Sequence, residues 1–165
     1  MSIDNNVLTR VIERFAHGGV DDALVLLVNL VGDSPTWLKT IDELANDALK
    51  MGEGDLSKAI YEHLKIIKPL SPIGYSGYAR CLFFEGAWQI CVDEWALCFR
   101  DFPQHVRPNW YRQQGNALLR LNRLTQATDV FESCISRFPQ SPVGYESLAV
   151  GLQEKAYWRE ALRQW

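Results

Sequence analysis

The sequence predicts an all-α protein built as an array of antiparallel helix pairs, an alpha-solenoid, and two observations support this prediction. The first is an internal repeat, because the phrase Ser71-Pro-Ile-Gly-Tyr75 returns as Ser141-Pro-Val-Gly-Tyr145 with one exchange. A period in the mid-thirties is typical of helical solenoids. The second is that apolar residues keep helical spacing, while no alternating run flanked by turns predicts a strand.

The repeat has fixed positions at which bulky and small apolar residues return every 34 to 36 residues. In residues 108–141 these positions are Tyr111, Gly115, Leu118, Ala127, Phe131, Cys134 and Pro139. Thirty-four residues later they become Tyr145, Ala149, Leu152, Ala161 and Trp165. We therefore predict one domain over residues 1–165, with repeats at 4–37, 38–71, 72–107 and 108–141 and an incomplete fifth at 142–165.

The first two repeats predict four helices. The first pair spans residues 4–16 and 21–31, joined by a turn at His17-Gly18-Gly19, where glycine tolerates the backbone angles needed. Ser34-Pro35 predicts the next helix start, since serine is a good N-cap and proline fits the first turn. After the turn at 51–55, a fourth helix ends before Pro69.

The later repeats predict six more helices by the same signals. Ser71-Pro72 begins the fifth helix, Gly86 marks its turn, and the sixth spans 88–99. Pro108 begins the seventh, and the eighth spans 125–137. Ser141-Pro142 begins the ninth, and residues 157–165 begin a tenth.

Neighbouring helix pairs are predicted to stack, because each pair exposes an apolar stripe that it cannot bury alone. Small residues are expected to let helices approach closely, at Gly115, Ala127, Ala149 and Ala161. Bulky aromatic residues are expected to fill the spaces between pairs, at Trp95, Tyr111, Phe131, Tyr145 and Trp165.

Composition excludes several classes of protein. A hydrophobic content of 47% with 22% charged residues excludes a disordered chain. A net charge of −3 without a Lys/Arg run gives no support for a nucleic-acid partner. The chain has no signal peptide or apolar run long enough for a membrane, so we expect no membrane partner and a cytoplasmic location. The four cysteines lack zinc-site spacing and are expected to be buried, reduced thiols.

At the fixed positions the sequence resembles the tetratricopeptide repeat (TPR) family. Its signature, Trp-x2-Leu-Gly-x2-Tyr, then Ala-x3-Phe, then Pro, is similar to Tyr111-x2-Gln-Gly115-x2-Leu118, Ala127-x3-Phe131 and Pro139 here, with three exchanges. The resemblance implies a TPR-like right-handed superhelix whose first helices line a concave groove. It further implies a scaffold that binds a protein or peptide segment and catalyses nothing.

The groove positions that the resemblance implies include two arginines and an asparagine suited to a carboxylate. Arg112 and Asn116 are four residues apart and share one helix face, and Arg80 occupies the equivalent face one repeat earlier. The pair is similar to half of the carboxylate clamp of chaperone-binding TPR domains, although Ser147 stands where that clamp has Asn. The predicted groove residues are Arg80, Phe83, Phe84, Asn109, Arg112, Asn116, Arg120 and Ser147.

An acidic or C-terminal segment of another protein is therefore the predicted ligand. The alternative that these arginines are solvated, or pair with Glu146, remains open at this point. No catalytic residues, metal site or cofactor are predicted, because His17, His63 and His105 each lack ligand spacing or a neighbouring nucleophile motif.

Two other functions remain open. The apolar face of Ala161, Leu162 and Trp165 has no polar capping helix after it and is a candidate surface for self-association, so a homo-oligomer is one alternative. The Phe-Pro-x-Ser-Pro-x-Gly-Tyr phrasing also resembles repeat regions fused to bacterial glycan-processing enzymes. That resemblance implies an N-terminal regulatory or docking domain of a longer enzyme.

Overall fold

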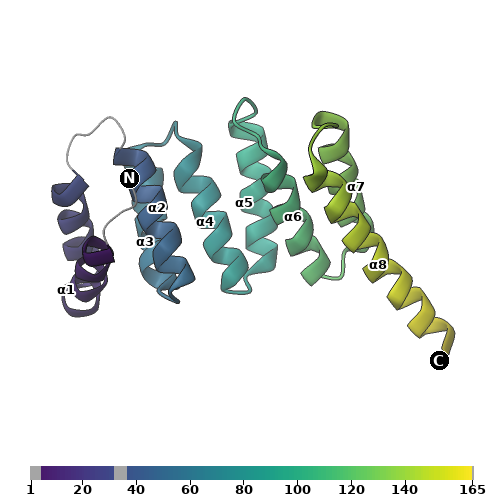
Figure 1. The fold of residues 1–165 in the computed structure, drawn as a ribbon, viewed down its shortest axis with the longest axis horizontal. Helices are drawn as coiled ribbons and strands as arrows, with labels where there is room; N and C mark the ends of the chain where they lie inside the picture. Colours follow the sequence, from purple (N-terminus) through teal and green to yellow (C-terminus); the bar gives the residue numbers. More distant parts are fainter. Residues whose placement is uncertain (1–4, 32–36, 165) are drawn as a thin grey trace. The chain divides into compact units, whose positions relative to one another are not determined.

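A computed structural model describes residues 5–31 and 37–164, which form helices joined by short turns, with no strand among them (Figure 1). The chain divides into two compact units, residues 1–85 and 86–165. The all-α prediction is confirmed, whereas the single domain over residues 1–165 stays a prediction. No described helix is both long and apolar enough to cross a bilayer.

The first unit contains α1 (Asn5–Val31), α2 (Trp37–Lys50), α3 (Gly54–Ile67) and α4 (Pro72–Phe84). α1 is two helices in sequence, because Gly19 has φ 80° and ψ −170° and reverses the chain there, within the predicted turn (Figure 1). The side-chain oxygen of Ser71 accepts a hydrogen bond from the Ile73 amide, as expected of the cap that begins α4. The equivalent Ser34-Pro35 pair lies outside the described residues.

The core of the first unit is mainly aliphatic, with the aromatic Tyr61 within it, and comes from all of its helices. Its most buried large side chains are Val11, Leu27, Leu44, Leu56, Ile60, Tyr61 and Leu64. They stand at helical spacing on α1, α2 and α3, so the apolar stripes that sequence periodicity predicts do pack against one another. Ile67 is an exception, since it keeps the spacing but is 39% exposed at the end of α3.

The second unit contains α5 (Trp88–Asp101), α6 (Pro108–Arg120), α7 (Leu124–Arg137) and α8 (Pro142–Gln164). Two fully buried aromatic residues, Trp95 on α5 and Phe131 on α7, pack on either side of α6. The centroid of the Trp95 ring lies 5.6 Å from that of Trp110, and the Phe131 ring lies against Gly115. Gly115 therefore allows a close approach and Trp95 and Phe131 are buried between helices, in line with the small and bulky roles expected of them.

α8 departs from the prediction. It is one helix of 23 residues and continues past the end of α7, so the separate tenth helix over 157–165 is wrong (Figure 1). The cause lies in the turn. Every positive φ among the described residues falls between the two helices of a repeat, at Gly19 (80°), Gly52 (91°), Gly86 (79°) and Asn122 (57°).

The residue 34 positions after Asn122 is Ala156. Left-handed backbone costs an ordinary L-residue about 1–2 kcal/mol, whereas glycine and asparagine adopt it readily. Alanine is also the best helix former. The fifth repeat therefore lacks the residue that reverses the chain, and its first helix continues straight.

The straight α8 leaves exposed two residues that were predicted to be packed. Tyr145 is 50% exposed instead of filling a space between helix pairs, and Ala149 is exposed instead of allowing a close approach. The side chains of Ala161, Leu162 and Trp165 lie outside the described residues.

All four cysteines are buried and carry free thiols, as predicted. Burial raises the pKa of the Cys91 thiol to about 12, and burial also raises the pKa values of Cys81 and Cys134. Because the thiolate is the reactive form, a raised pKa keeps these groups protonated and unreactive at pH 8. We expect Ellman's reagent to label the native chain at pH 8 very slowly and to titrate all four thiols once guanidinium unfolds it. Rapid labelling of the native chain would contradict this burial.

Candidate partner-binding face

The predicted groove residues fall on both units. Arg80, Phe83 and Phe84 belong to α4 of the first unit, and the others belong to α6 and α8 of the second.

In the second unit, one side of α6 carries the polar residues Asn109, Arg112, Asn116 and Arg120, named here the α6 polar face. Arg112 Nη2 donates to Asn109 Oδ1 over 2.8 Å, which holds the guanidinium along the helix. Asn109 and Arg120 are exposed, while Arg112 and Asn116 are half-buried. The structure therefore brings together the arginine and asparagine that the sequence placed on one face.

No carboxylate of the described residues forms an ion pair with Arg112 or Arg120. Glu146, the predicted intramolecular alternative, is exposed on α8 and makes no such pair among them. An arginine presents five donors in a rigid fork, and a single neutral amide satisfies only part of that capacity. The α6 polar face thus has a guanidinium available to an external carboxylate.

The opposite side of α6 fixes which way this face points. Trp110 is 7% exposed and its ring centroid lies 6.0 Å from that of Phe99 on α5. Gly115 meets the ring of Phe131 on α7, and Leu118 is buried in the same cluster. Aromatic packing on both flanks prevents rotation of α6, so the polar residues are held outward.

Ser147 on the neighbouring α8 does not extend the α6 polar face. It is 5% exposed, and its Oγ has no hydrogen-bond partner among the described residues. A buried hydroxyl cannot contact a surface ligand without movement of the helix. Of the clamp-like residues in this unit, only those on α6 are accessible.

In the first unit, Arg80 belongs to a closed hydrogen-bonded cluster. Its Nη2 donates to Asp42 Oδ1 on α2 over 3.0 Å and to Tyr61 Oη on α3 over 2.8 Å. The Tyr61 hydroxyl donates in turn to Asp42 Oδ1 over 2.9 Å. Burial raises the pKa of Tyr61, so the hydroxyl stays protonated and can make that donation. Arg80 therefore joins three helices and has its charge neutralised internally.

Asp42 and Tyr61 were not singled out from the sequence, although a signal for Asp42 was present. In the second repeat Asp42 occupies the position that Arg112 occupies in the fourth. Opposite charges on the first helices of consecutive repeats, Asp42 and Arg80, favour an internal pair. Phe84, at the end of α4, is 70% exposed, and its ring makes an edge contact with half-buried Phe83.

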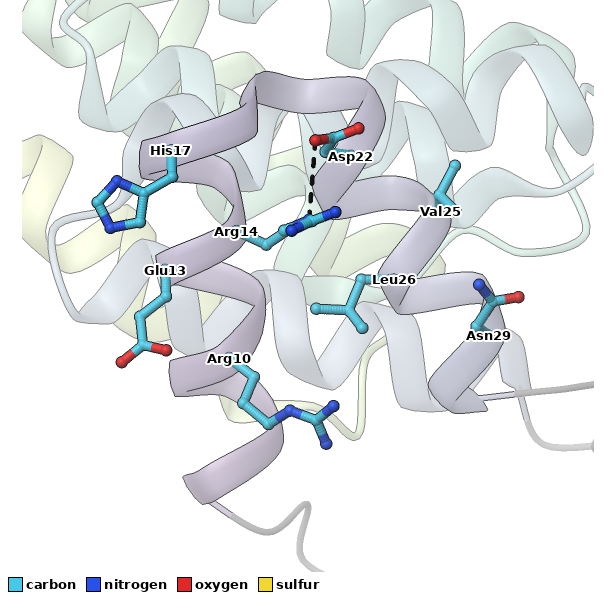
Figure 2. Close-up of a pocket in the computed structure, with 8 residues that line it drawn as sticks. All are labelled: Arg10, Glu13, Arg14, His17, Asp22, Val25, Leu26 and Asn29. Carbon is cyan, nitrogen blue, oxygen red and sulfur yellow. Dashed lines mark ion pairs between the residues drawn. The ribbon is translucent and has the colours of Figure 1, made fainter.

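A hollow between the two halves of α1 was also not predicted. It is open, measures about 440 Å³, and is lined by four residues from each half, as Figure 2 shows. Arg14 Nε and Asp22 Oδ2 lie 3.7 Å apart across it, both largely exposed, and an exposed pair of this kind contributes little to stability. A smaller hollow of about 260 Å³ lies between α1 and His63 of α3. The larger hollow is lined by both acidic and basic side chains, so its charges favour neither an anionic nor a cationic ligand.

The paired helices α6 and α7 have 13 and 14 residues, the sequence repeats every 34 to 36 residues, and the two helices pack closely at Gly115. Together these features define a tetratricopeptide repeat fold. Solved TPR structures share it. The first TPR domain of human RPAP3 matches with a TM-score of 0.65 at 18% identity, over 75% of this chain and 96% of that one. A thermophilic TPR protein from Thermus thermophilus matches with a TM-score of 0.66 at 19% identity, over 97% and 87%.

A further match is the first TPR of Spaghetti (RPAP3) bound to the HSP90 peptide SRMEEVD, with a TM-score of 0.62 at 18% identity, over 72% of this chain and 93% of that one. No protein-family model and no curated protein matches the sequence. The resemblance to the TPR family is thus confirmed at the level of the fold.

Proposed function

We propose that this chain is a non-catalytic scaffold for protein–protein interaction and that it binds a carboxylate of a partner segment on the α6 polar face. The observation that carries the proposal is Arg112, which Asn109 holds beside Asn116 on an accessible face and which pairs with no carboxylate of the described residues. Charge-assisted hydrogen bonds from a guanidinium to a carboxylate are stronger than hydrogen bonds between neutral groups. The forked guanidinium can donate two such bonds to one carboxylate.

The TPR fold supports the same proposal, since one of its solved members binds a peptide with three acidic residues, SRMEEVD. The first unit contributes less to carboxylate binding, because Arg80 already forms an ion pair with Asp42. A cytoplasmic setting, in which thiols remain reduced, fits the four free cysteines. The ligand is therefore a protein segment whose acidic side chain or C-terminal carboxylate reaches α6.

We expect Arg112→Ala to weaken binding of such peptides about 10- to 100-fold, since a hydrogen bond to a charged group contributes about 1.5–3 kcal/mol. The measurement is fluorescence polarisation with a panel of acidic peptides, each made with a free C-terminal carboxylate and as its amide. Arg112→Lys keeps the charge but loses the fork, and we expect an intermediate affinity.

The matched control is Arg123→Ala, which removes an exposed arginine at the start of α7 that makes no side-chain cap. Its affinity should equal that of the unchanged chain. Equal affinities for Arg112→Ala and the unchanged chain, with a peptide that does bind, would refute the proposed site.

A further inference from the structure

The exposed residues of α8 include an apolar stripe that is in register with a buried surface one repeat earlier. Tyr145, Ala149, Leu152 and Ala156 recur at helical spacing and are all exposed, with Tyr145 and Leu152 each at 50%. We name them the α8 stripe. The α6 residues equivalent to Ala149 and Leu152 are Gly115 and Leu118, and both are buried.

The structure shows what covers these positions in the fourth repeat. A Cβ on Gly115 would lie 2.1 Å from the ring of Phe131, so α7 packs directly on this face of α6. α7 also carries buried Ala127, which lies in the same cluster as Leu118. A helix that covers this face of α6 therefore has an alanine and, four residues later, an aromatic residue at the contact.

The same spacing recurs in the sequence, because Ala161 and Trp165 stand 34 residues after Ala127 and Phe131. Residues 157–164 cannot reach the stripe of their own chain, because α8 continues through Ala156 without a turn. At a rise of 1.5 Å per residue, the end of α8 at Gln164 lies about 18 Å along the helix axis from Leu152. The sequence that would complement the α8 stripe is therefore present in the chain, but the straight helix keeps it from packing on that stripe.

We propose that two copies of this chain pair through α8 in antiparallel orientation, so that residues 157–165 of each copy cover the α8 stripe of the other. Exchange of an identical element between protomers is an accessible route to a dimer when a hinge stays extended. The antiparallel arrangement places the second half of one helix beside the first half of its partner, so each copy supplies the missing helix of the other's fifth repeat.

The charges along α8 fit this orientation. Residues 142–154 carry Glu146 and Glu154 and no basic residue, whereas residues 155–165 carry Lys155, Arg159 and Arg163 against the single acid Glu160. Antiparallel pairing brings the acidic half of each copy against the basic half of the other, and parallel pairing would oppose like charges. Antiparallel helix dipoles favour the same arrangement.

The test measures molar mass by light scattering, on the full chain from about one to several hundred micromolar, together with three single variants. We expect the unchanged chain to form a dimer. Leu152→Glu places a charge in the stripe and should raise the dimer dissociation constant at least 100-fold. Val150→Glu is the matched control, since Val150 is 48% exposed on α8 but lies outside the stripe, and it should remain dimeric.

Ala156→Gly supplies the residue type found at the other turns and should let residues 157–165 fold back on their own stripe, so we expect a shift to monomer with the helical circular dichroism retained. A monomeric unchanged chain at every concentration would overturn the proposal, and so would a dimer that Leu152→Glu leaves intact. A dimer insensitive to Ala156→Gly would overturn the exchange of residues 157–165. None of these outcomes depends on peptide binding at α6.

Discussion

Replacing Phe131 with alanine is expected to lower the free energy of unfolding by about 4 kcal/mol, the middle of the range for truncating a buried aromatic residue. The Phe131 side chain is fully buried on α7. One edge of its ring meets Gly115 of α6, and the other edge lies 3.2 Å from the place where a Cβ on Gly151 of α8 would stand. Its loss leaves a cavity among three helices. Urea unfolding followed by circular dichroism measures the effect.

Gly115→Ala probes the same contact from the other side. The added Cβ would lie 2.1 Å from one ring carbon of Phe131 and 2.4 Å from a second, and the ring has no exposed edge along which to move. We expect a loss of about 1–3 kcal/mol from overpacking alone. In the double variant with Phe131→Ala the new methyl group enters the vacated space, so the two losses should fall short of additive by at least about 1 kcal/mol.

Gly54→Ala is the control for the general effect of replacing a helical glycine. A Cβ there meets nothing within 4 Å, so the change should be neutral or slightly stabilising. Additive losses for Gly115→Ala and Phe131→Ala would show that the ring does not rest on Gly115. Because this packing orients α6, the single variants should also weaken any carboxylate binding at Arg112.

The packing around Phe131 was predictable from the sequence for a specific reason. A repeat imposes the same environment at each equivalent position, so spacing alone predicted a close approach at Gly115 and a buried, space-filling ring at Phe131. Helix starts were predictable where a Ser-Pro pair supplies both a cap and a suitable backbone angle, as at Ser71. Such local and periodic signals do not depend on knowing which helices are neighbours.

α8 shows where periodicity misleads. The apolar positions of the fifth repeat continue in register to Trp165, which predicts a reversal, but the turn itself needs a residue that accepts left-handed backbone. Ala156 does not supply one, and the helix continues. The local preference of one residue therefore decides whether the apolar pattern folds back on itself.

Arg80 shows a second limit of sequence reasoning. Its position predicted a ligand-binding role, yet its partners Asp42 and Tyr61 lie on two other helices, 38 and 19 residues away in sequence. Whether a groove arginine is free or paired depends on those tertiary neighbours. Arg112, on the first helix of the next repeat, pairs with no carboxylate among the described residues, and this difference separates a structural arginine from a candidate binding residue.

Asp42→Ala is accordingly expected to destabilise the first unit by about 3 kcal/mol, because it removes the only carboxylate among the described residues that pairs with Arg80. The Arg80 side chain is 24% exposed, so water replaces that partner only in part. The change also removes the acceptor of the Tyr61 hydroxyl. Unfolding in urea again gives the measurement.

Glu43→Ala provides the matched control one residue along α2. It breaks an ion pair with Lys39 in which the two side chains are 43% and 78% exposed, and such surface pairs contribute about 0–1 kcal/mol. A loss for Asp42→Ala no larger than that of this control would mean that the cluster is solvated. Replacing Asp42 and Arg80 together with leucine should recover most of the stability lost in Asp42→Ala, since the main penalty is a buried charge without its partner.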